Sequence, residues 1–302
     1  MAVTTKIRDW KIIVLRQRII TAALLMLALI AATTLLSSFN FAVLFALLTL
    51  LATWEWSGFI GLNEPRSKVI YCRTIASMIF GLFFLLRITP AAQNIDAVRA
   101  AIILGLGLLF WTLALFMLST YPQNKKLWND ESKIASMGMF TLIPTWVGLV
   151  QLKYLLPDGY LVLVLIVLVA AVDVGAYFFG VNFGRRKLAP NVSPKKSWEG
   201  VWGGFTVCLL IGLGFAWMMH TYLLELSIWR FLLLGVLILC VTFFSVVGDL
   251  LESMLKRNQN IKDSGSLLPG HGGLLDRVDG LMAATPSFVL LTMLILGDSQ
   301  YA

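Results

Sequence analysis

Long apolar runs are the feature that most constrains how this chain can fold. Nine of them succeed one another, each close to the roughly 20 residues that a helix needs to cross a bilayer. Barrel strands would instead alternate polar and apolar residues over short segments, so helices are the expected spanning form. Only 13% of the 302 residues are charged, which is typical of a bilayer protein. The runs centre on 19–36, 40–60, 74–90, 100–119, 135–152, 160–180, 201–220, 231–251 and 281–297.

The positions of the basic residues predict how these helices are oriented. If the amino terminus lies in the cytoplasm and nine spans follow, 20 of the 24 Lys and Arg residues fall on the cytoplasmic side. We therefore predict an all-α polytopic integral membrane protein with about nine transmembrane helices, a cytoplasmic amino terminus and a carboxyl terminus outside. This distribution accounts for the net charge of +8, so the charge does not indicate nucleic-acid binding.

The chain shows no repeat and no separate soluble domain. We divide it into 1–133, with four spans and little catalytic signal, and 134–302, with five spans and the candidate site. The first run has a basic leader but no small-residue cleavage site, so we expect a span rather than a signal peptide. The short polar leader favours a bacterial inner membrane. Three cysteines lack metal-ligand spacing and are expected to act as small apolar residues: Cys72, Cys208 and Cys240.

Two longer polar stretches, 181–200 and 252–280, combine basic residues with glycine or proline. Both face the cytoplasm in the predicted topology, so a functional site is expected between them. Isolated acids lie in the apolar runs as well. Asp173 sits well inside its run, where a carboxylate costs several kcal/mol unless it is paired, hydrated or bound to a cation, which favours a functional role. Glu55 lies nearer a helix end, which favours structural pairing.

Carboxylates are spaced for a shared helix face at the borders of the second stretch. Asp249 and Ser253 are four residues apart, with Glu252 beside them, which suits a hard cation such as Mg²⁺ but also an ordinary amphipathic helix end. Asp276 and Asp279 are three residues apart and share a face if a helix begins there. Adjacent carboxylates repel unless they share a cation, so this second pair favours the metal interpretation.

Basic residues are grouped apart from these acids. Their charges suit phosphate oxygens, and the neighbouring Gly270, Gly272 and Gly273 let the backbone approach an anion. The stretch 193–200 adds a compact cationic group that we predict to bind nucleotide phosphates, although it is not a Walker-type loop. Arg185, Arg186 and Lys187 also suit non-specific contact with anionic head groups. The basic candidates, with their neighbouring hydroxyl, are Lys195, Lys196, Ser197, Lys256, Arg257, Lys262, His271 and Arg277.

These groups together predict phosphoryl or nucleotidyl transfer at a membrane surface, because such reactions need positioning and neutralised charge more than covalent help. The location predicts a lipid acceptor. Carboxylates would hold divalent cations, and basic side chains would hold several phosphates.

The second stretch resembles the signature of the phosphatidate cytidylyltransferases (CDP-diacylglycerol synthases). The segments 173–180, 193–200 and 248–253 also look like that family. The resemblance is firm over 170–280 and only compositional before about residue 130. The signature positions, which show no departure from the family pattern, are Ser253, Lys256, Arg257, Lys262, Asp263, Gly265, Leu268, Pro269, His271, Gly272, Gly273, Asp276, Arg277 and Asp279.

The resemblance implies a Mg²⁺-dependent reaction of CTP with phosphatidate that gives CDP-diacylglycerol and pyrophosphate. A second cation, divalent or K⁺, and a homodimer are also expected. Mapped onto this chain, Asp249, Asp276 and Asp279 would hold metal. Asp173 would support the site from within the bundle. The triphosphate would be bound by Lys195, Lys196 and Ser197, and the phosphate of phosphatidate would be oriented by Lys256, Arg257, Lys262 and His271.

Two rival functions remain at this point. A CTP-dependent kinase of a polyprenol or of phytol would also join a nucleotide to a membrane lipid, but it would release CDP. A transporter that uses Asp173 and Glu55 as a proton relay would move substrate without consuming CTP. The transporter offers no reason for the pattern at 253–279.

Overall fold

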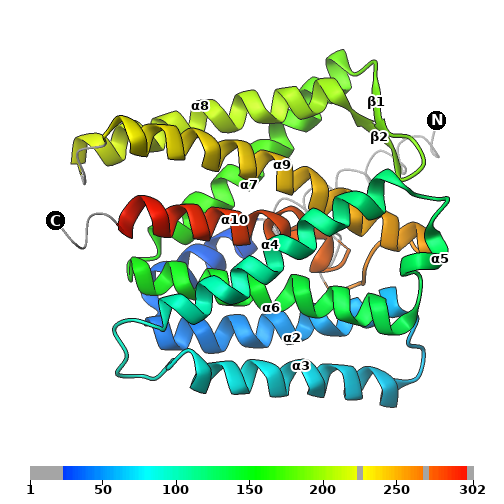
Figure 1. Ribbon diagram of the computed structural model, residues 1–302, viewed down its shortest axis with the longest axis horizontal. Coiled ribbons are helices and arrows are strands. Elements are labelled where there is room, and N and C mark those ends of the chain that lie inside the picture. The colour runs from blue at the N-terminus through cyan, green and yellow to red at the C-terminus, as the bar shows by residue number, and fades with distance from the viewer. Residues whose placement is uncertain (1–22, 223–226, 268–271, 298–302) are drawn as a thin grey trace, which may run out of the picture.

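The protein is an assembly of long helices that run roughly along one direction, as Figure 1 shows. The computed structural model describes residues 23–222, 227–267 and 272–297. The helices are α2 (Ser38–Ile60), α3 (Pro65–Leu85), α4 (Ala97–Ser119), α5 (Lys125–Trp128), α6 (Glu131–Leu155), α7 (Tyr160–Phe183), α8 (Trp198–Tyr222), α9 (Ile228–Asn258) and α10 (Leu275–Gly297). The two strands are β1 (Lys187–Ala189) and β2 (Ser193–Ser197).

The predicted class, an all-α polytopic membrane protein, is confirmed. Within the described residues, eight helices are long and apolar enough to cross a membrane, namely all of those above except α5. The first predicted run, 19–36, contains a shorter apolar helix over Ala23–Leu35. Its earlier residues lie outside the described part of the chain, so the count of nine spans stays a prediction.

Several helix boundaries differ from the apolar runs, for local reasons. α3 begins at Pro65 rather than near residue 74, because proline suits the first helical position, where its missing N–H is not needed. α9 continues past its apolar part to Asn258, and α10 begins at Leu275 rather than at 281. Glu252, Asp276 and Asp279 are therefore carried by helix ends, whereas Asp263 lies in the loop between them.

α6 forms the centre of the bundle. Most of its residues are buried, and it packs against α2, α4 and α10. Two buried indoles fix α2 on its surface, because Trp56 Nε1 donates to the carbonyl oxygen of Ile134 at 2.9 Å and Trp146 Nε1 donates to that of Ala42 at 3.0 Å. α2 is thereby held firmly enough for its own polar side chain, Glu55, to reach a defined place.

A small hairpin, β1–β2, joins α7 to α8, where the sequence indicated only a polar loop. The strands are antiparallel, with Lys187 opposite Ser197 and Ala189 opposite Ser193. α7 and α8 pack closely, because a side chain at Gly175 would overlap the backbone of Gly203. The hairpin lies at the same end of the bundle as α5 (Figure 1). This end is where the polar side chains of α9 and α10 are found.

Candidate active site

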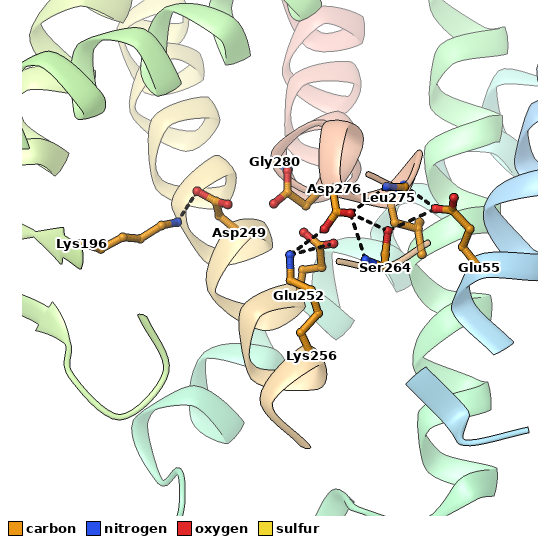
Figure 2. Close-up of polar contacts among 11 residues, drawn as sticks. Glu55, Lys196, Asp249, Glu252, Lys256, Ser264, Leu275, Asp276 and Gly280 are labelled. Atoms are coloured by element: carbon orange, nitrogen blue, oxygen red, sulfur yellow. Dashed lines mark hydrogen bonds and ion pairs between the residues drawn. The ribbon is translucent and has the colours of Figure 1, made fainter. Parts of the chain in front are cut away.

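Carboxylates from two consecutive helices meet at one end of the bundle, as Figure 2 shows. α9 carries Asp249, Glu252 and Lys256 at spacings that place them on one face, and α10 opens with Asp276 and Asp279. The helices touch at this level, because a side chain at Gly248 would overlap the carbonyl oxygen of Asp279. The predicted convergence of these carboxylates is therefore present in the structure.

The open pair, Lys196 with Asp249, connects the hairpin to α9. Lys196 Nζ donates to Asp249 Oδ2, and 25% of the lysine side chain and 36% of the aspartate side chain are exposed. Asp173, on the exposed side of α7, lies close enough for the charges of both residues to act on it. Partial exposure means that solvent and a diffusing ligand reach this pair.

The closed cluster consists of Glu252, Lys256 and Asp276. Lys256 Nζ lies 2.7 Å from Asp276 Oδ1 and 3.3 Å from Glu252 Oε1. The exposed fractions are 18% for the lysine, 9% for the aspartate and 3% for the glutamate. Such buried charges need partners of opposite charge, so the lysine and the two carboxylates stabilise one another in this cluster.

Asp276 also organises the loop that leads into α10. Its Oδ2 accepts hydrogen bonds from the Ser264 N–H at 2.9 Å, the Ser264 hydroxyl at 3.0 Å and the Gly273 N–H at 2.9 Å. Hydrogen bonds to an ionised acceptor are among the stronger ones in proteins. Both oxygens of Asp276 are thus engaged by the protein itself, in contrast to the metal role that the sequence suggested, which stays a prediction.

Glu55 reaches the same loop from α2. It is 7% exposed, and its Oε2 accepts from the Leu275 N–H at 2.9 Å and from the Ser264 hydroxyl at 3.2 Å. A carboxylate at the first N–H of α10 is favoured by the partial positive charge of a helix amino terminus. The expected structural pairing is confirmed, but its partners are a backbone amide and a hydroxyl. Sequence reasoning missed that these partners belong to the candidate site.

The first residues of α8 close the hairpin. Ser197 is 4% exposed and caps the helix, because its hydroxyl accepts from the Gly200 N–H at 3.2 Å. The Glu199 carboxylate accepts from the backbone N–H groups of Arg185 and Arg186 at 3.0 and 3.1 Å. These contacts fix β2 so that Lys195 is exposed and Lys196 points to α9.

The remaining predicted residues fall into three groups. Arg257, Lys262 and Arg277 are exposed, on α9, on the loop that follows it and on the first turn of α10. Asp279 lies close enough to Asp249 and Glu252 for their charges to act on it, so it belongs to the site. His271 lies outside the described residues.

The charged groups at this end of the bundle are anionic as a set. Four carboxylates and two lysine ammonium groups meet here, so full ionisation leaves two uncompensated negative charges among these six groups. Within the described ranges, no three His, Cys, Asp or Glu side chains are gathered so that they could hold a metal ion, and lysines pair with Asp249 and Asp276. A cation at Asp249 and Asp279 would require Lys196 to turn away. Oxygen ligands of this kind are those that Mg²⁺ prefers.

Comparison with known proteins extends the similarity to almost the whole chain. A family model described as the cytidylyltransferase family matches residues 16–295. A phosphatidate cytidylyltransferase of Pseudomonas aeruginosa is 41% identical over 277 residues, which cover 92% of this chain and 96% of that protein. One from Haemophilus influenzae is 37% identical over 295 residues, with 93% and 100% covered. The similarity therefore reaches well beyond the 170–280 segment on which the motif resemblance rests.

Proposed function

This chain belongs to the cytidylyltransferase family, and from that premise we infer that it transfers CMP from CTP to phosphatidate. The products are CDP-diacylglycerol and pyrophosphate, so the protein is a nucleotidyltransferase of phospholipid biosynthesis. The observation that carries this inference is the similarity to two phosphatidate cytidylyltransferases over more than nine-tenths of the chain. The cluster of carboxylates and lysines at one end of the bundle supplies groups suited to that chemistry.

The hairpin is the proposed binding element for the triphosphate of CTP. Lys195 is exposed. Lys196 is partly exposed, and its ion pair with Asp249 lies where solvent reaches the site. An incoming triphosphate would compete with Asp249 for the Lys196 ammonium group, because both partners are anionic. Ser197 supports this binding because its hydroxyl caps α8 and so fixes the end of β2, where Lys196 lies.

Asp249 and Asp279 are the proposed ligands of Mg²⁺, with Asp276 at the border of the same group. When bound, the ion would supply positive charge that neutralises the phosphates of CTP. Asp173 would add negative charge from α7, which supports cation binding beside the open pair. A second cation, divalent or K⁺, is proposed on the same charge argument.

The lipid phosphate is proposed to lie against Arg257 and Lys262, which are exposed at this end of the bundle, with Lys256 and His271 adding positive charge. An oxygen of the phosphatidate phosphate attacks the α-phosphorus of CTP in line with the leaving group. The bond from the α-phosphorus to the bridging oxygen breaks, and pyrophosphate leaves with the electron pair. Phosphatidate is already anionic near neutral pH, so no general base is required.

Purified protein with radiolabelled CTP and phosphatidate tests this proposal. We expect labelled CDP-diacylglycerol and pyrophosphate in equal amounts, no product in the presence of a chelator, and recovery when Mg²⁺ is returned. Release of CDP in place of pyrophosphate would instead identify a lipid kinase. Asp279→Asn protein that is folded but retains full activity would remove the proposed metal site.

The polar end is proposed to face the cytoplasm of a bacterial inner membrane. The distribution of basic residues supports this orientation, because 20 of the 24 Lys and Arg fall on that side of the predicted topology. Lys195→Cys, made in a chain whose Cys72, Cys208 and Cys240 are replaced by alanine, tests it. An impermeant maleimide should label this cysteine in inside-out vesicles and not in intact spheroplasts, and the reverse result would invert the topology.

A homodimer is proposed from the family resemblance alone. The mass of the detergent-solubilised protein, measured after subtraction of bound detergent, tests this state. Twice the chain mass of 33.5 kDa is expected, and a stable species of single mass would reject the proposal.

A further inference from the structure

A single carboxylate ties the two ends of the β1–β2 hairpin together. Glu199, in the first turn of α8, accepts hydrogen bonds through Oε2 from the backbone N–H groups of Arg185 at 3.0 Å and Arg186 at 3.1 Å. The Trp198 N–H donates to the Arg186 carbonyl oxygen at 2.9 Å. The segment that enters the hairpin is therefore bound to the segment that leaves it, and hydrogen bonds to an ionised acceptor are among the stronger ones in proteins.

The strand pairing gives this hairpin little stability of its own. β1 has three residues and β2 has five, and the register is irregular between Lys187 and Ala189. An isolated two-stranded hairpin is at best marginally stable in water. The place of β2 therefore depends on contacts outside the strands, and the Glu199 carboxylate supplies two of them at the base of the hairpin.

The helices beneath the hairpin provide a firm base for these contacts. α7 and α8 meet closely, because a Cβ at Gly200 would lie 2.9 Å from the Ala176 carbonyl oxygen. A Cβ at Gly184 would likewise lie 2.8 Å from the Ser197 hydroxyl oxygen. Closely packed groups of this kind do not shift readily. The hydrogen bonds of Glu199 therefore hold the hairpin against a fixed part of the molecule.

The orientation of β2 decides which lysine meets α9. Successive side chains of a strand point to opposite faces, so Lys195 is exposed while Lys196 Nζ donates to Asp249 Oδ2 (Figure 2). A slip of one residue would turn Lys195 toward α9 and Lys196 away from it. Glu199 lies three residues after Lys196, so its hydrogen bonds fix where this lysine side chain starts.

An acid at this position also has an ordinary structural role. A carboxylate in the first turn of a helix is stabilised by the partial positive charge there, and the backbone N–H of Glu199 itself acts on its carboxylate. That role would stabilise α8 without any effect on Lys196. The hydrogen bonds from Arg185 and Arg186 go further, because these residues lie 14 and 13 positions back along the chain, at the other end of the hairpin.

We propose that Glu199 is a positioning residue for CTP, which acts by fixing β2 so that Lys196 meets the triphosphate. This inference rests on the proposed function of the hairpin. The sign of its effect is distinctive, because a carboxylate beside a triphosphate repels it by charge alone. If charge alone mattered, removing Glu199 would lower the KM for CTP, whereas the loss of a positioning contact raises it.

Steady-state kinetics of purified Glu199→Ala protein test this sign. We expect the KM for CTP to rise about fivefold while kcat changes less than about twofold, as when a contact made equally to substrate and transition state is lost. Glu131→Ala is the matched control, because Glu131 is an exposed acid in the first turn of another spanning helix, α6. It should leave the KM unchanged. A KM that falls in Glu199→Ala, or that rises equally in both variants, would overturn the proposal.

Two further variants separate positioning from a general loss of stability. One oxygen of Glu199 accepts from both N–H groups, so Glu199→Gln keeps an acceptor without the charge and should hold the KM within about twofold of the wild type. In Lys196→Met protein, Glu199→Ala should add no further rise, because its effect passes through that lysine. A glutamine variant as impaired as the alanine variant, or fully additive effects of the two changes, would reject this route.

Labelling of lysines with acetic anhydride tests the position of Lys196 without any turnover. Lys196 is paired and Lys195 is exposed, so mass spectrometry should show slower labelling of Lys196 in the wild type. The ratio of Lys196 to Lys195 labelling should rise several-fold in Glu199→Ala and stay at the wild-type value in Glu199→Gln and Glu131→Ala. An unchanged ratio in Glu199→Ala would reject the inference even if CDP-diacylglycerol forms. Wild-type protein that forms no CDP-diacylglycerol would instead reject the proposed function, while the ratio would still show whether Glu199 positions Lys196.

Discussion

The open pair and the closed cluster contain the same chemical groups in different surroundings. Lys196 and Asp249 meet with a quarter and a third of their side chains exposed, whereas Lys256 binds Asp276 and Glu252 almost out of solvent. Exposed ion pairs contribute little to stability, while breaking a buried pair leaves a charge without compensation. One polar end thus holds two kinds of contact, exchangeable ones for ligands where solvent reaches it and fixed ones for its own loop behind.

The largest expected effect is a loss of CMP transfer when the open pair is changed. Asp249→Asn removes the carboxylate charge that is proposed to bind the metal. We expect product formation to fall about a thousandfold, in the range of losses seen when an electrostatic group is removed from an active site. Thermal unfolding should hardly change, because the pair is partly exposed. The measurement is the rate of CDP-diacylglycerol formation beside a thermal melt. Loss of both activity and fold would place Asp249 in the closed cluster.

Replacing Lys256 or Lys196 by methionine should distinguish the closed cluster from the open pair by the free energy of unfolding. Lys256→Met leaves Glu252 and Asp276 without their cation, and we expect a loss of about 3 kcal/mol in the free energy of unfolding. Lys196→Met is the matched control, with an expected loss below about 1 kcal/mol and a raised KM for CTP. Denaturation monitored by tryptophan fluorescence measures both. Equal losses would mean that exposure does not distinguish the two pairs.

A change at Glu55 tests whether the loop that contacts the closed cluster is also held by the first half of the chain. Glu55→Gln weakens an acceptor for the Leu275 N–H and the Ser264 hydroxyl, so we expect a loss of about 1–2 kcal/mol and activity reduced roughly tenfold. Glu64→Gln is the control, because Glu64 is exposed beside α3 and its side chain makes no capping hydrogen bond. Identical behaviour of the two variants would refute a positioning role for Glu55.

The sequence predicts these two regions unequally. The apolar runs identify the helices, and the spacing of Asp276 and Asp279 places both on one helix face, because helical periodicity is local information. Asp249 is grouped with them only through the family resemblance. The contact of Glu55 with Leu275 joins residues far apart in the chain, and no local pattern encodes it. The hairpin was likewise missed, since it depends on Glu199 holding the backbone of Arg185 and Arg186.

The smallest expected effect concerns salt. Charges at the open pair are screened by mobile ions, whereas those of the closed cluster are not, because screening acts on solvent-exposed groups. Raising ionic strength from about 0.05 M to about 0.5 M should therefore raise the KM for CTP about two- to threefold in the wild type, with the melting temperature almost unchanged. In Lys196→Met the salt dependence should shrink, because one of the screened charges is gone. A melting temperature that falls with salt while KM stays constant would contradict this prediction. It would mean that salt screens the closed cluster rather than the open pair.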